Sequence, residues 1–189
     1  MRERAVQVAD TRRRLVEAAM FLHGTVGPAA TTVAGIAEQA GVTRLTVYRH
    51  FPDQEAVFAA CSAHWASQQV PPDTDAWAAI SDPEQRVRVG LADLYRFYRS
   101  GEDMLTRIYA DLDALPESHR LGLQDRHRRH RDLLVGPFGR TGARRQRLRA
   151  VLGHATSFAT WRSLCVDNGL SNAAAVEAMT ALVLATADP

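Results

Sequence analysis

The chain has 189 residues, of which 23% are charged and 46% hydrophobic, and a formal net charge of +2. These values are ordinary for a globular chain, so they argue against disorder, and the charge is too small to indicate a nucleic-acid partner by itself. No apolar run is long enough to span a bilayer, and the opening segment MRERAVQVADTRRR lacks the apolar core of a signal peptide. We therefore expect a cytoplasmic protein that makes no use of a membrane.

Helical periodicity dominates the sequence, and no segment predicts a convincing strand. The expected helices cover residues 10–23, two short segments within 32–51, 53–69, a segment from 82 onward, 102–115, 116–135, 143–167 and 171–186. The sequence therefore predicts an all-α fold of about nine helices, with a three-helix head followed by a helical body.

The segment 32–51, TVAGIAEQAGVTRLTVYRHF, predicts two short helices joined by a tight turn. Thr32 and Thr43 are expected N-caps, since a threonine hydroxyl can accept from the first turn of a helix. Gly41 stands where a helix ends in a left-handed residue. Val47 and Phe51, four residues apart, would face inward. This is the pattern of a helix–turn–helix, whose second helix enters a major groove.

The outward face of that second helix carries the expected DNA contacts. Arg44 lies in the first turn, and its guanidinium can match guanine O6 and N7. Leu45 can touch a thymine methyl, and Arg49 can reach a base or a phosphate. The full set of expected contacts is Thr32, Thr43, Arg44, Leu45, Thr46, Tyr48, Arg49, His50 and Gln54. The alternative is that Tyr48 and His50 merely pack against neighbouring helices.

At these residues the chain resembles the TetR-family transcriptional regulators, whose pattern is T-x-x-x-I-A-x-x-A-G-V-(S/T)-x-x-T-(V/L)-Y-x-H-F. The upstream segment LVEAAMFLHGTVG is similar to the family's first helix, and the match covers roughly the first third of the chain. The resemblance implies a DNA-binding domain over residues 1–55 and an effector-binding and dimerisation domain over 56–189. It also implies that Thr32, Thr43, Tyr48 and His50 bind DNA phosphates.

One position departs from the family pattern. Many members have a lysine where this chain has Gln54, which can donate a hydrogen bond but releases no counterion. The arginines of the N-terminal arm would compensate, or the arm is only a solvated tail. These arginines are Arg2, Arg4, Arg12, Arg13 and Arg14.

The resemblance implies a pocket in the body for a small effector of unknown identity. Its expected lining is Phe58, Cys61, Trp65, Leu94, Tyr95, Tyr98, Ile108, Tyr109, His127, His130, His154, Phe158 and Trp161. From spacing alone, the aromatic residues in this set are more typical of an ordinary core, so the pocket rests mainly on the resemblance. His127 and His130 share one face of the helix 116–135 with His119, so they fit core histidines, a polar pocket wall or, least well, a metal site. We expect no metal and no cofactor.

Apolar stripes on the last two predicted helices indicate a homodimer, because one subunit would not cover them. The stripes comprise Leu148, Leu152, Ala155, Ala159, Ala175, Met179, Leu182 and Val183. A two-fold dimer would present two recognition helices to a palindromic operator in double-stranded DNA.

The predicted function is a homodimeric repressor that a small-molecule effector releases from its operator through a tilt of the helix 53–69. Two alternatives stay open: an effector-independent regulator or activator, and a helical enzyme or binding protein with an incidental helix–turn–helix. The sequence has no nucleophile elbow, phosphate loop, HExxH or CxxC, so we expect no enzyme.

Overall fold

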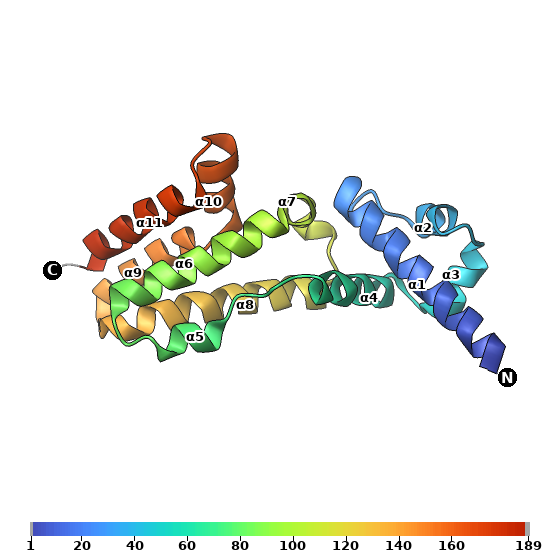
Figure 1. Cartoon of the computed structure of the whole chain (residues 1–189), viewed down its shortest axis with the longest axis horizontal. Coiled ribbons are helices and arrows are strands. Elements are labelled where there is room, and N and C mark those ends of the chain that lie inside the picture. Colours follow the sequence, from blue (N-terminus) through green and yellow to red (C-terminus); the bar gives the residue numbers. More distant parts are fainter. Residues whose placement is uncertain (1, 188–189) are drawn as a thin grey trace. The chain divides into compact units, whose positions relative to one another are not determined.

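The computed structural model describes residues 2–187, with side chains from residue 3 onward, and in that range the chain forms eleven α-helices and no strand (Figure 1). The predicted all-α class is confirmed. The helices are α1 (Arg2–Thr25), α2 (Val33–Gln39), α3 (Arg44–His50), α4 (Gln54–Ser67), α5 (Thr74–Ala79), α6 (Pro83–Ser100), α7 (Glu102–Ala110), α8 (Glu117–Val135), α9 (Gly142–Ala155), α10 (Phe158–Arg162) and α11 (Asn172–Ala187). None of these described helices is long and apolar enough to cross a membrane.

The chain divides into two compact units. The first comprises Met1–Val70 and Gly101–Arg120, and the second comprises Pro71–Ser100 and Leu121–Pro189. Helices α1 to α4 and α7 belong to the first unit, and α5, α6, α9, α10 and α11 belong to the second. The predicted division at residue 55 concerns functional roles, and it stays a prediction.

Helix α1 is the backbone of the first unit. It contacts α2, α4 and α7, and α2 and α3 lie on one side of it (Figure 1). Leu15 and Ala19 of α1 are fully buried in a core that also holds Ile36 of α2 and Val47 and Phe51 of the α3 region. Val47 and Phe51 therefore face inward, as their spacing predicts.

The caps of the short helices α2 and α3 are those that the sequence predicts. The Oγ1 of Thr32 accepts from the Gly35 N–H at 3.0 Å, and that of Thr43 accepts from the Thr46 N–H at 3.3 Å. Gly41 has a φ of +65°, the left-handed conformation expected at the end of α2. These local bonds fix where α3 begins.

Three predicted helix boundaries are wrong. The helix predicted over 102–115 ends at Ala110. Helix α1 begins at Arg2 rather than near residue 10, because residues 2–9 contain good helix formers and neither glycine nor proline. The helix predicted over 143–167 is broken after Ala155. There Thr156 Oγ1 donates back to the Leu152 carbonyl at 2.8 Å, and Ser157 Oγ caps α10 by accepting from the Thr160 N–H at 3.1 Å.

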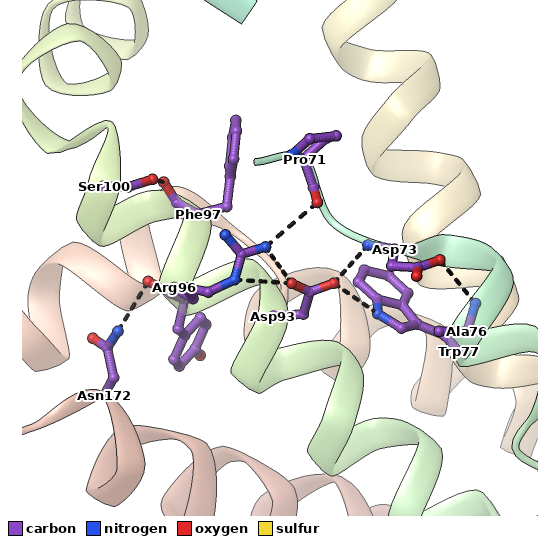
Figure 2. Close-up of polar contacts among 10 residues, drawn as sticks. Pro71, Asp73, Ala76, Trp77, Asp93, Arg96, Phe97, Ser100 and Asn172 are labelled. Carbon is purple, nitrogen blue, oxygen red and sulfur yellow. Dashed lines mark hydrogen bonds and ion pairs between the residues drawn. The ribbon is translucent and has the colours of Figure 1, made fainter. Parts of the chain in front are cut away.

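Helix α5 is an element that the sequence analysis missed. Its N-cap is Asp73, whose Oδ1 accepts from the Ala76 N–H at 2.9 Å, and its Trp77 is fully buried (Figure 2). The Trp77 indole N–H donates to Asp93 Oδ2 of α6 at 3.1 Å, and the backbone N–H of Asp73 donates to the same oxygen at 2.6 Å. Asp93 therefore fastens α5 to α6 from within the second unit.

The core of the second unit is aromatic. Tyr98 packs edge-on against Phe158, with ring centroids 5.5 Å apart, and Phe158 packs against Trp161 at 5.3 Å. The hydroxyls of Tyr95 and Tyr98 donate to the carbonyls of Ala155 and Thr156 at 2.8 and 2.7 Å. These bonds satisfy the carbonyls at the break between α9 and α10 and tie them to α6.

The stripes predicted for a dimer interface need correction. Five of the eight residues are fully buried within one chain, because α11 packs against both α6 and α9. These five are Leu148, Leu152, Ala155, Ala175 and Val183. Of the rest, Ala159 is exposed, Met179 is half-buried and Leu182 is 43% exposed. A partner subunit can therefore contact only the opposite faces of these helices.

Candidate nucleic-acid interface

The outward face of α3 is available to a partner. Leu45 is 60% exposed and Tyr48 is 55% exposed, and Arg44 and Arg49 are exposed beside them. Since Val47 on the opposite side is buried, α3 is anchored by one face and presents the other. More than half of the Tyr48 side chain is exposed and His50 is half-buried, so both can meet a partner, and their contact with DNA stays a prediction.

This face is positively charged without compensation. The segment 39–52 contains Arg44, Arg49 and His50 and no acidic residue. Within residues 2–187, neither Arg44 nor Arg49 makes an ion pair or a side-chain hydrogen bond with another residue. Guanidinium groups in this state can bind phosphate or the acceptors of guanine.

The remaining predicted contacts belong to the same unit. Thr32 caps α2, Thr43 caps α3, and Gln54 is the exposed first residue of α4. Thr43 Oγ1 and Thr46 Oγ1 lie 3.0 Å apart and share a hydrogen bond, so one of these two hydroxyls keeps a donor for a phosphate. A contact between any of them and DNA stays a prediction.

Sequence reasoning missed how α1 holds this surface in place. Arg12 Nη1 donates to the His50 carbonyl at 3.0 Å, at the end of α3, and Arg14 Nη1 donates to the Ala40 carbonyl at 3.2 Å, at the end of α2. Arg13 pairs with Asp10 at 2.6 Å. These three arginines therefore contact protein groups and are not the free cations of a solvated arm. Of the other two, Arg4 is exposed and the Arg2 side chain lies outside the described part of the chain.

The predicted effector-pocket residues fall into both units. Phe58, Cys61, Trp65, Ile108 and Tyr109 lie in the first unit. The other eight lie in the second unit, where the aromatic ones form the packed core described above. These eight are Leu94, Tyr95, Tyr98, His127, His130, His154, Phe158 and Trp161.

Two histidines of that set, His130 and His154, have surroundings that the sequence pattern could not predict. His130 is buried against Trp77, with ring centroids 5.3 Å apart, and burial lowers its pKa to about 4, so it is a neutral core histidine. His154 is exposed on α9, so it stands outside the packed aromatic core. The spacing of residues along α8 and α9 does not indicate that His130 packs against Trp77 or that His154 is exposed.

These features define a DNA-binding helix–turn–helix. A family model of the bacterial regulatory proteins of the tetR family matches residues 15–61, which include α2, α3 and the start of α4. Over these residues the chain has the helix–turn–helix of a TetR-family transcriptional regulator.

Known relatives extend the likeness beyond the head. An uncharacterized HTH-type transcriptional regulator of Mycobacterium tuberculosis is 34% identical over 120 residues, which cover 60% of this chain and 58% of the relative. The chain thus matches less than two thirds of the length of its curated relatives.

Solved structures share the fold over most of the chain. The TetR family regulator PfmR from Thermus thermophilus has a TM-score of 0.64 and 20% identity, with coverage of 91% of this chain and 97% of that one. A TetR-like regulator from a Rhodococcus species has a TM-score of 0.67 and 17% identity, with coverage of 92% and 93%. At these identities the comparison establishes the fold alone.

Proposed function

We propose that the protein is a DNA-binding transcriptional regulator that acts as a homodimeric repressor on a palindromic operator and is released by a small-molecule effector. The observation that carries the proposal is the exposed, acid-free face of α3, with two unpaired arginines on a helix that is otherwise anchored in the core. Such a face matches the major groove in shape and charge.

The salt dependence of DNA binding tests the electrostatic part of the proposal. Each phosphate contact made by a cation contributes about −0.9 to the slope of log K against log salt concentration. We expect the double substitution of Arg44 and Arg49 by Gln to make this slope less steep, measured by fluorescence anisotropy on a mixed-sequence duplex. The control is Arg128→Gln, on an exposed residue of α8. An equal change in both variants would contradict the role given to α3.

The homodimer rests on the faces of α9 and α11 that their own unit leaves uncovered. Leu182 lies on that face of α11, and an apolar residue with 43% of its surface exposed suits a two-fold contact. We expect Leu182→Arg to convert a dimer to a monomer in multi-angle light scattering at micromolar concentration. Leu121→Arg, at an exposed leucine of α8, is the matched control and should leave the dimer intact. A wild-type monomer would refute this part of the proposal.

A further inference from the structure

The first unit contains a cavity of about 260 Å³ beside the helix–turn–helix. Its walls come from the end of α1, the connection from α1 to α2, the start of α4 and the segment that precedes α8. The lining residues that the argument uses are His23, Thr31, Ile36, Glu55, Phe58 and Ala114. All lining residues belong to the one compact unit, so the cavity is a property of that unit alone.

One wall of the cavity is held in shape by local hydrogen bonds. Asp111 Oδ2 accepts from the Ala29 N–H at 3.0 Å, and Thr31 Oγ1 donates to the Gly27 carbonyl at 2.8 Å. Gly27 has a φ of +90°, and a Cβ at this position would clash with Asp111 Oδ2. The loop is therefore fixed in one conformation, and the cavity does not depend on a mobile segment.

His23 supplies a polar group to the cavity. Its side chain is only 6% exposed, and its Nδ1 lies 3.3 Å from Cys61 Sγ. Burial lowers the pKa of His23 to about 4 and raises that of Cys61 to about 12, so both groups are neutral at pH 7. Since imidazole nitrogen is a better acceptor than sulfur, the thiol donates to Nδ1 and the ring proton sits on Nε2. Among residues 2–187, Nε2 has no hydrogen-bond partner.

The other lining groups restrict the occupant further. Glu55 is the charged residue of the lining, and its Oε1 accepts from Ser118 Oγ at 2.5 Å. Because a carboxylate repels negative charge, it disfavours an anionic ligand in the cavity. Ile36 and Phe58 make the deeper wall apolar. In size the cavity exceeds one of about 150 Å³ that holds benzene, and it approaches the lower limit of about 300 Å³ for drug-sized ligands.

We propose that this cavity binds a small, neutral, largely apolar molecule of about one ring, whose hydroxyl or carbonyl oxygen accepts from His23 Nε2. Gln54 also lines the cavity and is a proposed DNA contact. An occupant would therefore contact the start of α4 and affect the DNA contact of Gln54. Only that consequence for DNA rests on the function proposed above; the binding itself does not.

The first experiment titrates the full-length protein, without DNA, with cyclohexanone and follows ¹⁵N and ¹H NMR signals. We expect saturable binding of one molecule per chain, with the His23 Nε2 resonance among the largest shifts. The comparison probe is methylenecyclohexane, in which a CH2 group replaces the oxygen, and cyclohexanecarboxylate tests the exclusion of anions. Absence of saturable cyclohexanone binding, or shifts confined to the second unit, would overturn the proposal.

Variants make the test specific to the cavity. His23→Phe keeps a ring against Phe58 and should weaken cyclohexanone at least fivefold while changing methylenecyclohexane less than twofold. Ala114→Phe, at an exposed lining residue, should abolish binding by filling the space. Ala110→Phe is the matched control on an exposed, non-lining alanine and should bind as wild type.

If Ala114→Phe does not fold, Val33→Phe fills the same cavity from α2. Wild-type affinity for cyclohexanone in a folded cavity-filling variant would contradict the proposal. Because none of these measurements contains DNA, their failure would leave the proposed regulatory function standing. Failure of DNA binding would, in turn, leave the ligand site standing.

Discussion

The guanidinium carbon of Arg12 lies 4.3 Å from the centre of the Phe51 ring, and Arg12 Nη1 donates to the carbonyl of the neighbouring His50. Phe51 is the C-cap of α3 and is buried, so this contact joins α1 to the end of the recognition helix. Arg14 makes the corresponding bond to Ala40 at the end of α2. Through these two arginines, α1 sets the orientation in which α3 presents its outer face.

We expect Arg12→Ala to lower the free energy of unfolding by about 1–2 kcal/mol, the sum of an exposed cation–π contact and one hydrogen bond. Urea denaturation of the full-length protein measures the change. Arg13→Ala is the control, because within the described part of the chain Arg13 pairs only with Asp10 and Glu17, on the exposed side of α1. Similar midpoints for the two variants would show that the contact with Phe51 does not hold α3.

Arg44→Ala should weaken specific DNA binding by about 1–3 kcal/mol and relax the preference at one base pair in each half-site, because a bidentate contact to guanine is lost. The measurement is a binding titration against a preferred duplex and against its single-base variants.

Tyr48→Phe is the matched comparison on the same exposed face. It removes a hydroxyl that is expected to donate to a phosphate, so it should weaken binding to all sequences by a similar factor. If both variants changed base preference in the same manner, the division of α3 into a base-reading and a phosphate-binding residue would be wrong.

Asp93 is the acceptor on which the packing of α5 depends. Besides Trp77 and the Asp73 backbone, it accepts from Arg96 Nη2 at 2.5 Å and Arg96 Nε at 3.2 Å, and Figure 2 shows donors from these three residues converging on its carboxylate. Asp93→Ala leaves the buried Trp77 indole N–H without its acceptor, so we expect a loss of about 1–3 kcal/mol in unfolding free energy. Asp125→Ala, on a carboxylate of α8 that pairs with exposed arginines, should change little. An equal loss in both variants would contradict this role.

The buried His130 makes stability depend on pH. Burial is the main cause of its low pKa, and the positive groups His127, Arg126 and Arg129 lower it further while Asp93 raises it. The folded protein therefore keeps His130 neutral down to a pH of about 4, whereas the unfolded chain binds a proton near its ordinary pKa of 6.5.

It follows that this contribution to stability is complete above pH 6.5 and is lost as the pH falls from 6.5 to about 4. The loss is at most about 3 kcal/mol, from a pKa difference of about 2.5 at 1.36 kcal/mol per unit. His130→Phe keeps a ring against Trp77 and should flatten the pH dependence in that window, with His23 accounting for part of what remains. Urea denaturation between pH 4 and pH 8 measures the unfolding free energy as a function of pH. The same pH dependence in His130→Phe as in the wild type would refute the role given to His130.

The sequence was enough to predict the structure wherever the interactions that determine it are local. The caps at Thr32 and Thr43 act within three residues, and the left-handed Gly41 is a matter of its own backbone, so the helix–turn–helix could be predicted in detail. The exposed arginines of α3 followed from the same register.

Contacts between distant residues escaped prediction for a physical reason. Trp77 is buried by Asp93 and His130, and no local pattern pairs residues so far apart. The break between α9 and α10 could have been predicted from Ser157, because a serine can cap a new helix. The continuous apolar periodicity over 143–167 instead predicted one helix. Leu148 does lie on a buried apolar face of α9, but this face is covered within its own chain and not by a second subunit. The spacing of apolar residues along α9 does not tell which surface covers them.

The measurement that tests the central claim most directly is selection of bound duplexes by the full-length protein from a random double-stranded DNA library, repeated with Arg44→Ala. The account predicts enrichment of a palindromic site with two half-sites about one helical turn, or a multiple of it, apart, and loss of preference at one base pair in each half with the variant. Enrichment of no sequence, or of the same site with unchanged preference by Arg44→Ala, would contradict it.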